Sequence, residues 1–507
     1  MPLARAWSVA LLGVDGHVIE VEADLSAGLP GLSLVGLPDA ALSEARDRVR
    51  AAVHNSKLAW PTQRITVGLS PAALPKAGSG FDVAIAAAVL AANGTVPADR
   101  LAASVLIGEL GLDGRLRSTR GVLPAVLAAV RAGWDRIVVP AANAAEAALI
   151  PGVQVCGVEW LTELVAELRG EAPVVNLPTV VPPPDDPEPD LADVVGQDFA
   201  RFALEVAAAG GHHLFLHGAP GAGKTMLASR LPGILPSLSD EHAVEVTAVH
   251  SVAGLFRSGA SLIRRPPLQA PHHSATMQAL VGGGGRVLRP GAASIAHRGV
   301  LFLDEAPEFR AGVVDALRQP LESGVIEIAR ATSSARFPAR FQLVLAANPC
   351  PAACADVRSC TCPSLARRRY LGRLSGALLD RIDLRVEVLP ASRAALLDNA
   401  GSPEPTAALR ARVLAARAAA QARLAGTGWV TNSEVPGAVL RGRFRLPKRA
   451  LAPAMTALDR GRLSARGYDR ILRISWTLAD LAGRSEPGPD EVRVAIELRS
   501  AADGSQP

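Results

Sequence analysis

Long hydrophobic runs are missing from this sequence of 507 residues, although 49% of its residues are apolar. No stretch of about 18 apolar residues runs free of charges and helix breakers, which is what a membrane-spanning helix requires. The N-terminal segment holds a short apolar patch, but Asp15 and Glu20 follow it at once and no cleavage-like site is clear. We therefore expect a cytoplasmic protein with no membrane partner.

Cysteine is also scarce, with five in the whole chain. Four of them crowd between Cys350 and Cys362, which is not the spacing of a secreted disulfide framework. A strong charge of either sign is absent as well, because the formal net charge is only +5. A charge this mild permits nucleic-acid binding without requiring it. The length and the apolar content allow about three domains, each with its own core.

One stretch dominates what the sequence does contain, the segment GHHLFLHGAPGAGKTMLASR at residues 211–230. The apolar run Leu214–His217 predicts a buried strand, and a helix is expected from Met226 to Leu231. Glycines let successive backbone N–H groups face phosphate oxygens, a lysine can reach the β and γ phosphates of ATP, and a threonine hydroxyl can bind Mg²⁺. The sequence therefore predicts an ATP site, and a chance glycine-rich turn is the disfavoured alternative. The pattern G-x-x-x-x-G-K-[ST] is formed by Gly218, Ala219, Pro220, Gly221, Ala222, Gly223, Lys224 and Thr225.

A second predicted buried strand, Val300–Leu303, ends in Asp304 and Glu305. A carboxylate at the carboxyl end of a strand can face the phosphate loop, because ligands bind at that edge of such sheets. We expect Asp304 to hold Mg²⁺ and Glu305 to orient and polarise the attacking water. Two solvated acids at a strand end are the alternative, which the complete phosphate loop upstream disfavours.

Two further side chains complete the predicted ATP site. A third apolar strand, Phe341–Ala346, is followed by Asn348, whose amide could bind the water or the γ-phosphate. Arg381 lies in a short segment after the predicted sheet. In a lone subunit it would be an ordinary surface arginine, but in a ring it could reach a neighbour's γ-phosphate as an arginine finger.

The rest of the chain divides by composition. The N-terminal part mixes short apolar runs, predicted as strands, with alanine-rich segments, predicted as helices over Asp82–Ala92 and Val122–Ala132, which is typical of an α/β domain. A stretch with seven prolines follows and predicts an extended linker. After Pro390 the pattern is helical. The expected parts are a front domain at 1–170, the linker at 171–190, an ATPase at 191–392 and a helical region at 393–507.

These pieces together resemble one family, the magnesium-chelatase-like AAA+ ATPases of the ComM/YifB type. The resemblance covers nearly the whole chain and is carried by HGAPGAGKTMLASRLPGILP, APHHSATMQALVGGGGRVLRPGAASIAHRGVLFLDEAPEF, ARFPARFQLVLAANPCP and RRRYLGRLSGALLDRIDL. It implies an α/β protein with a Lon-protease-like (S5-type) front domain, an AAA+ P-loop NTPase core and a helical C-terminal lid.

The same resemblance implies a homohexameric ring that binds single-stranded or branched DNA and drives branch migration during natural transformation. The magnesium chelatases proper work with other subunits to insert Mg²⁺ into a porphyrin, and they lack the fused front domain. An ATPase subunit of a chelatase-like complex, or of an unfoldase, is therefore the alternative function.

The segment LPKAGSGFDVAIAAAVL, from residue 74, resembles the part of Lon-type proteases that carries their serine nucleophile. In that alignment Gly80 or a neighbour takes the serine position, and the lysine positions fall near Leu123 and Ala125. A Ser–Lys dyad needs a lysine to activate the hydroxyl, and Ser79 has no evident base. We expect a Lon-like scaffold without peptidase activity.

The resemblance places DNA contacts on two inserted segments. A glycine-rich loop before Arg286 and Arg289 is similar to a mobile basic loop of the family, with a solvated turn as the alternative. Residues 325–340 predict a hairpin that would point Arg330 and Arg336 into the ring pore. Such arginines bind phosphates and give affinity without reading sequence.

Another arginine matches the family's sensor-2 position, where a lid contacts the nucleotide. The segment SARGYDRILRISWTLADLAG resembles the last lid helices, and Arg466 opens its predicted helix. Arg470 and Arg473 are the alternatives for the same role.

The cysteine-rich segment CPAACADVRSCTC has the spacing C-x₃-C-x₅-C-x-C. Its four thiolates could hold a tetrahedral zinc ion. The family usually reads NPCPCG here, so Ala352 stands where a cysteine is expected and Cys354 would substitute for it. Unliganded thiols in a polar loop are an equal alternative. The cofactor prediction is therefore ATP and Mg²⁺, with zinc open at Cys350, Cys354, Cys360 and Cys362.

Overall fold

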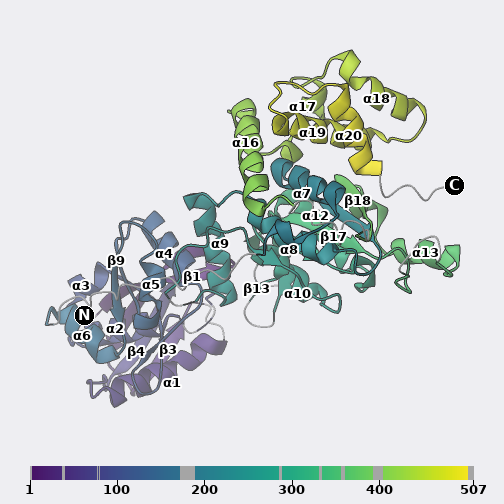
Figure 1. Cartoon of the computed structure of the whole chain (residues 1–507). Helices are drawn as coiled ribbons and strands as arrows, with labels where there is room; N and C mark the ends of the chain where they lie inside the picture. The colour runs from purple at the N-terminus through teal and green to yellow at the C-terminus, as the bar shows by residue number, and fades with distance from the viewer. Residues whose placement is uncertain are drawn as a thin grey trace.

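The computed structural model describes three successive regions of the chain, a front α/β domain, a central α/β domain and a C-terminal group of helices (Figure 1). The front domain lies at one end of the molecule, and the C-terminal helices lie against the central domain. The residues described are 3–36, 40–76, 78, 80–171, 189–257, 259–284, 288–329, 334–354, 360–391 and 403–500.

A seven-stranded mixed sheet organises the front domain, in the order β3-β4-β2-β1-β5-β8-β9. Its strands are β1 (Leu3–Leu12), β2 (Asp15–Ser26), β3 (Gly31–Val35), β4 (Arg64–Ser70), β5 (Val105–Leu106), β8 (Arg136–Pro140) and β9 (Gln154–Val158). The short strands β6 (Glu109–Leu110) and β7 (Leu116–Arg117) pair separately. The helices are α1 (Ala40–Asn55), α2 (Asp82–Ala92), α3 (Ala98–Ala102), α4 (Val122–Arg131), α5 (Ala144–Ala147) and α6 (Leu161–Arg169).

Helix α2 is the centre of the front core. Its predicted span is confirmed, and apart from Ala91 every residue of the helix is buried, because its sequence is apolar on all sides. Asp82 is the one charged residue of this helix. Its carboxylate accepts a hydrogen bond from Arg48 Nε at 2.9 Å and another from the Leu110 backbone N–H at 3.2 Å. Burial raises the pKa of Asp82, and the Arg48 guanidinium opposes that rise.

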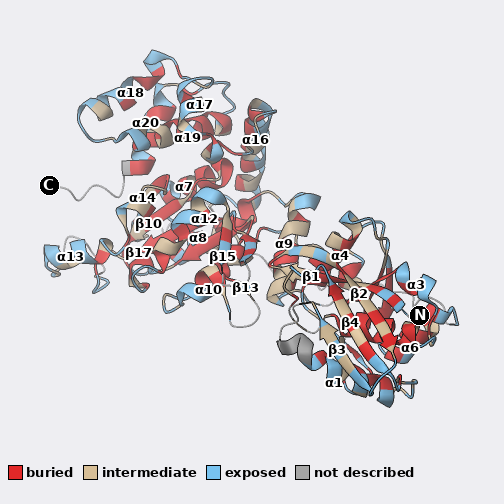
Figure 2. Cartoon of the chain, turned by 180° about the vertical axis from the view of Figure 1, so that it is seen from behind, coloured by how far each residue is buried: buried red, intermediate tan, exposed pale blue. Residues whose placement is uncertain are grey.

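A five-stranded parallel sheet organises the central domain, in the order β11-β14-β17-β10-β18. Its strands are β11 (Leu268–Gln269), β14 (Val300–Leu303), β17 (Gln342–Ala347), β10 (Leu214–Gly218) and β18 (Leu384–Val388). Every residue of β14 and β17 is buried (Figure 2), as expected for a parallel sheet covered on both faces. The three strands predicted around the ATP site, observed as β10, β14 and β17, therefore share one sheet.

The helices and hairpins of the central domain connect these strands. The helices are α7 (Asp198–Gly210), α8 (Lys224–Ile234), α9 (Asp240–Ala253), α10 (Met277–Val281), α11 (Ala292–Ile295), α12 (Arg318–Ser323), α13 (Ser364–Leu371) and α14 (Gly376–Leu379). The two antiparallel hairpins are β12 (Gly282–Gly283) with β13 (Arg289–Pro290), and β15 (Val325–Ala329) with β16 (Ser334–Pro338). The second pair confirms the hairpin predicted over 325–340.

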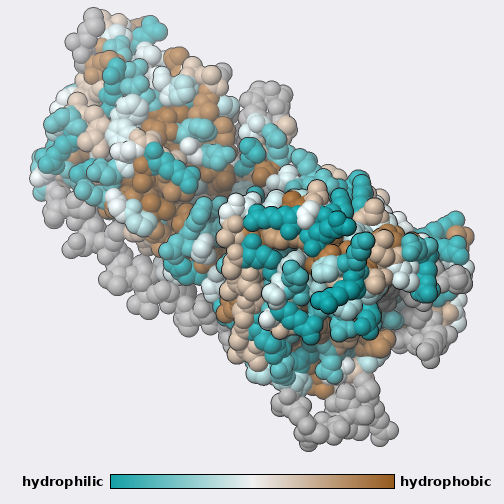
Figure 3. All heavy atoms as spheres, turned by 90° about the horizontal axis from the view of Figure 1, so that it is seen from above, coloured by the Kyte–Doolittle hydropathy of each residue, from teal (hydrophilic) through white to brown (hydrophobic). Residues whose placement is uncertain are grey.

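The C-terminal region is helical, with α16 (Thr406–Leu424), α17 (Gly437–Arg441), α18 (Lys448–Asp459), α19 (Ala465–Leu481) and α20 (Pro489–Ser500). Buried ionic contacts tie it to the central domain. Asp383, just before β18, accepts hydrogen bonds from Arg470 of α19 at 2.6 Å and from the ring of His212 at 3.1 Å. Seen from above, hydrophilic residues dominate the surface around the C-terminal helices, whereas hydrophobic residues gather on the N-terminal front domain (Figure 3).

The front and central domains meet along α4 and α9. Ala248 of α9 packs into the same apolar cluster as Leu123 of α4, and the Gly121 backbone N–H donates to the Ser251 carbonyl at 3.3 Å. The β1–β2 turn also touches the β15–β16 hairpin, because Gly13 forms a bridge with Arg336. Gly13 has a φ of +70°, and a Cβ there would clash with the Arg336 carbonyl oxygen, so both the conformation and the contact favour glycine.

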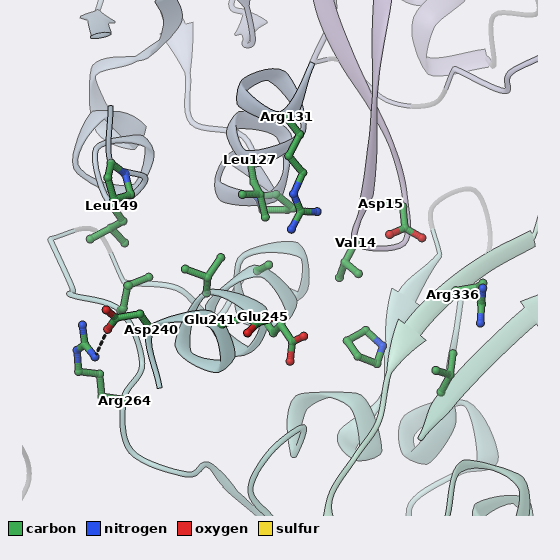
Figure 4. Close-up of a pocket in the computed structure, with 17 residues that line it drawn as sticks. Val14, Asp15, Leu127, Arg131, Leu149, Asp240, Glu241, Glu245, Arg264 and Arg336 are labelled. Atoms are coloured by element: carbon green, nitrogen blue, oxygen red, sulfur yellow. Dashed lines mark ion pairs between the residues drawn. The ribbon is translucent and has the colours of Figure 1, made fainter. Parts of the chain in front are cut away.

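A cavity of about 760 Å³ lies between the two domains (Figure 4). Leu127 and Arg131 of α4 face Glu241 and Glu245 of α9 across it, and Arg336 contributes from β16. The hairpin predicted to face a ring pore thus contacts the front domain as well.

Candidate nucleotide site

The phosphate loop joins the end of β10 to the start of α8. Gly221 and Gly223 have φ values of +74° and +92°, a left-handed conformation that side chains disfavour. A Cβ would meet nothing within 4 Å at either position, so the backbone conformation and not crowding requires glycine there. At Gly218 the reason differs, because a Cβ would clash with the Val388 carbonyl oxygen of the neighbouring strand. The strand, loop and helix predicted from the sequence are confirmed.

Lys224 begins α8 and turns back over the loop. Its ammonium donates to the carbonyl oxygens of Gly218 at 2.7 Å and Ala219 at 2.8 Å, and to Asn348 Oδ1 at 3.0 Å. Burial lowers the pKa of Lys224, while Asp304 and Glu305 oppose that shift. A cation surrounded by neutral acceptors at a helix N-terminus suits an incoming polyphosphate, whose charged oxygens are stronger acceptors than carbonyls.

The predicted magnesium ligands lie together. Thr225 Oγ1 donates to Asp304 Oδ2 at 2.7 Å, and the Glu305 backbone N–H donates to the other oxygen of Asp304 at 2.9 Å. The strand order explains this contact, since β14 and β10 flank β17 and present their carboxyl ends at one edge of the sheet. One hydroxyl and one carboxylate are the hard oxygen donors that Mg²⁺ takes in addition to water and phosphate. The donor set therefore fits the predicted ion.

Glu305 adopts an unusual backbone conformation, with a φ of +50° at a non-glycine residue. Such a conformation is uncommon and costly, and it occurs often at functional sites. The side chain reaches His273, whose Nδ1 lies 3.0 Å from Glu305 Oε2. The rings of His272 and His273 lie 4.0 Å apart, centroid to centroid. Sequence reasoning missed His273, because its partner follows on a different element and no metal-binding spacing marks the two histidines.

Asn348 follows β17, the strand that lies between β14 and β10 in the sheet. Besides its contact to Lys224, its backbone forms a hydrogen bond with the Tyr370 hydroxyl from α13. Burial raises the pKa of Tyr370 to about 12. The side chain of Asn348 is therefore placed against the phosphate loop, and Tyr370, which the sequence did not single out, bonds to its backbone.

The two predicted arginines of the ATP site are paired within their own chain. Arg381 forms an ion pair with Glu322 of α12 and also donates to the Ala377 carbonyl oxygen. Arg466 has a side chain that is 78% exposed, and its Nη1 lies 3.4 Å from Asp380. The alternatives for the sensor-2 role are engaged elsewhere, Arg470 with Asp383 and Arg473 with the Val435 carbonyl oxygen. The roles of Arg381 and Arg466 stay predictions.

The four predicted DNA-contacting arginines divide into two groups. Arg289 is exposed on β13, and Arg336 lines the cavity beside the front domain. Arg286 and Arg330 lie outside the described residues.

The positions that align with the catalytic lysine of Lon are occupied by Leu123 and Ala125. Leu123 and Ala125 are buried in α4. Lys76 is buried too, its ammonium donates to the Pro71 carbonyl oxygen, and burial lowers its pKa. Ser79, the nearby hydroxyl considered from the sequence, lies outside the described residues.

The four clustered cysteines could hold a metal ion such as zinc. Their sulfur atoms all lie within 4.8 Å of one another. Burial raises the pKa of the Cys350 thiol, but hydrogen bonds from the Cys354 backbone and the other thiols outweigh burial and bring it to about 7. The set comprises Cys350, Cys354, Cys360 and Cys362.

Comparison with known proteins matches three family models along the chain. "Subunit ChlI of Mg-chelatase" matches residues 21–143, "Magnesium chelatase, subunit ChlI" matches 190–396, and "Magnesium chelatase, subunit ChlI C-terminal" matches 403–499. The competence protein ComM of Haemophilus influenzae is 41% identical over 506 residues, which cover 99% of this chain and 98% of ComM. The chain belongs to the ComM/YifB family. This membership implies an AAA+ core with ATPase activity.

Other relatives agree with this placement. An uncharacterized protein of Mycobacterium tuberculosis is 56% identical over 499 residues, with 98% of this chain and 99% of the relative covered. The uncharacterized protein YifB of Escherichia coli is 40% identical over 491 residues, with 95% and 94% covered. A Lon protease of Geobacter metallireducens is 32% identical over 179 residues, only 34% of this chain and 21% of the protease. The likeness to Lon is thus partial. Among the described residues, no helix has both the length and the apolar character needed to cross a membrane.

Proposed function

We propose that this protein is a ring-forming DNA motor, a homohexamer that binds single-stranded or branched DNA and promotes branch migration by hydrolysing ATP. The observation that carries the proposal is the phosphate loop with its Thr225–Asp304 contact at 2.7 Å and the adjoining Glu305. The proposed cofactors are ATP and Mg²⁺. A relative named a competence protein at 41% identity supports a role in DNA handling.

In the proposed mechanism the phosphate loop and Lys224 bind the β and γ phosphates. Thr225 and Asp304 would hold Mg²⁺, which would supply neutralisation of the charge on those phosphates. Glu305 leaves His273 and accepts a proton from the attacking water, and Asn348 keeps that water in line with the γ-phosphate. Arg381 of one subunit leaves Glu322 and stabilises the charge that develops in the neighbour's site.

The proposed DNA contacts lie on the two hairpins of the central domain, through Arg289 and Arg336, with Arg286 and Arg330 beyond the described residues. The front domain would act as a scaffold. Its docking on α9 and on the β15–β16 hairpin supports a role in positioning that hairpin. The C-terminal helices would form the lid, with Arg466 at the nucleotide.

The experiment compares ATP turnover with single-stranded DNA, with an unfolded protein and with neither. We expect DNA to raise turnover several-fold and the unfolded protein to leave it unchanged and uncleaved. Stimulation by unfolded protein alone would contradict a DNA motor and favour the unfoldase alternative. A rate indifferent to both would favour the chelatase-like alternative.

A further inference from the structure

The loop between β17 and α13 brings four cysteines to one place although they are spread over thirteen residues of sequence. Its first turn is tight. Ala353 has a φ of +50°, and its N–H donates to the Cys350 carbonyl oxygen at 3.1 Å. This left-handed residue returns the chain so that the next N–H, that of Cys354, donates to Cys350 Sγ at 3.3 Å. A backbone N–H directed at a sulfur stabilises that sulfur as a thiolate, the form that binds metals.

The sulfur geometry suits one tetrahedral ion. A zinc ion bound at about 2.3 Å to four sulfurs holds them roughly 3.8 Å apart. The four sulfurs here lie within 4.8 Å of one another, so a contraction of about 1 Å at most completes the tetrahedron. The four cysteines are free thiols in the described structure, so none is diverted into a disulfide. Four sulfur donors leave no open coordination position, which is the pattern of a structural and not a catalytic zinc site.

The loop is connected to the ATP site at both ends. Cys350 is only 1% exposed and stands two residues after Asn348, which contacts Lys224. Cys362 stands two residues before α13, whose Tyr370 returns to bind the Asn348 backbone. A metal bound by the cysteines and the contact between Tyr370 and Asn348 would therefore hold the connection from β17 to α13 at two places.

Helix α13 itself has few other supports. It stands away from the body of the central domain (Figure 1), and of its residues only Tyr370 is buried. Arg368 and Arg369 are exposed on it, and Leu365 is 56% exposed. Tyr370 and the partly buried Leu371, which packs against the apolar cluster of the central domain, are the apolar anchors of this eight-residue helix, and short helices are marginal in water. A metal ion bound by the cysteine cluster at its start would add a further constraint.

We propose that Cys350, Cys354, Cys360 and Cys362 bind one structural zinc ion, which fixes α13 and holds Asn348 against the phosphate loop. Zinc is favoured over harder cations because all four donors are sulfur. Zinc binding also involves no change of oxidation state, so it requires no electron donor or acceptor. The site links the projecting helix to the residue that contacts Lys224.

The first test measures metal in the full-length chain, purified without chelators. We expect about one zinc per chain by elemental analysis, and replacement by cobalt should give the visible absorption of a tetrahedral cobalt thiolate site. Cys354→Ser should lower the zinc content at least five-fold. Cys156→Ser is the matched control, because Cys156 is a buried thiol of the front domain and its loss should leave the zinc content unchanged.

A second test keeps the proposal falsifiable if Cys354→Ser fails to fold. Zinc is extracted from the wild-type chain with a thiol-reactive mercurial and a chelator, followed by reduction. Backbone hydrogen exchange should then rise in residues 363–371 and around Asn348, fall again when zinc is restored, and stay unchanged in α2. A chain without zinc, an iron–sulfur spectrum, a disulfide among the four cysteines in the freshly purified chain, or exchange that ignores zinc would overturn the proposal. None of these readouts depends on DNA or on ATP turnover.

Discussion

Lys224 and Glu305 serve different steps of the proposed reaction, although both lie at the same edge of the central sheet. Lys224 is placed on the phosphate loop by three hydrogen bonds, so its contribution begins when the nucleotide binds. The Glu305 carboxylate is held by His273, so we expect its contribution to begin when water attacks. Substitutions at the two positions should therefore fail in different ways.

Glu305→Gln should bind ATP with an affinity within about two-fold of wild type and lose turnover by 10²-fold or more, because the amide spares the phosphate cradle and cannot accept a proton. Lys224→Ala should weaken ATP binding itself by at least ten-fold, since it removes the cation. Fluorescent-nucleotide titration and phosphate release measure the two effects. If Glu305→Gln hydrolysed ATP as fast as wild type, Glu305 would not be the residue that accepts the proton from water.

The His273 contact leads to a further expectation at the residue scale. A carboxylate that is paired with an imidazole is a poorer acceptor for a proton from water, and it is turned toward the histidine. His273→Ala should therefore raise ATP turnover without DNA by about two- to ten-fold and reduce the stimulation by DNA. His272→Ala, which removes the neighbouring ring and its bonds to Ser274 but leaves the His273–Glu305 pair, is the control. A loss of turnover as deep as that of Glu305→Gln would show instead that His273 supports the base.

Residue identity was predictable where a motif fixes it. The phosphate loop, Asp304 and Asn348 form local patterns, because each follows a buried strand at a set place. His273, Tyr370 and the Glu322 partner of Arg381 carry no such signal. Each meets its partner only through the fold, across a separation of 32 residues in the case of His273 and Glu305.

At the element scale, β10 depends on a neutral histidine at its start. The Leu343 backbone N–H donates to His213 Nδ1 at 3.0 Å, and the His213 carbonyl oxygen accepts from Leu384 at 3.1 Å, so this residue ties β17 and β18 to β10. Burial lowers the pKa of His213 to about 4, while Asp383 opposes the shift. A protonated ring could no longer accept the bond from Leu343.

The pH dependence follows in sign. The pKa of an unfolded histidine is about 6.5, so between about pH 6.5 and pH 4 the unfolded chain binds a proton that the folded chain refuses. His213 should leave the free energy of unfolding unchanged above about pH 6.5 and lower it by about 1–3 kcal/mol by pH 4. His213→Asn keeps an acceptor and cannot titrate, so its urea midpoint should fall less steeply on acidification than that of wild type. The exposed His54→Asn is the control, and parallel curves for wild type and His213→Asn would contradict the account.

The elements of the central sheet were predictable because parallel strands buried on both faces read as continuous apolar runs. β14 was predicted at its observed bounds, and β17 was predicted one residue early, over Phe341–Ala346 against the observed Gln342–Ala347. The front strand β1 was missed, since its apolar patch was considered only as a leader segment. Its ten pairs with β2 depend on a partner strand and cannot be read from Leu3–Leu12 alone.

At the scale of the whole molecule, the single chain holds an incomplete version of the proposed ATP site. Arg381 is engaged with Glu322 in its own subunit, and Arg466 is paired with Asp380. In a ring, an arginine finger acts on the nucleotide of the next subunit, so a complete site needs a phosphate loop from one chain and Arg381 from another. The sequence raised Arg381 as a candidate for this role, and the structure of one subunit shows only its contacts within its own chain.

We propose that ATP hydrolysis by this chain is completed between subunits, and an experiment that mixes two variants tests this proposal. Arg381→Ala should bind ATP nearly normally and hydrolyse it slowly, and Lys224→Ala should be inactive. In an equal mixture of the two, roughly a quarter of the interfaces pair an intact phosphate loop with an intact Arg381. Hexamer formation, subunit exchange and single-strand binding are checked in the same samples. We predict that turnover returns in the mixture although neither variant is active alone. Exchanging, DNA-bound rings that stay inactive would contradict the account, because Arg381 would then serve only its own subunit.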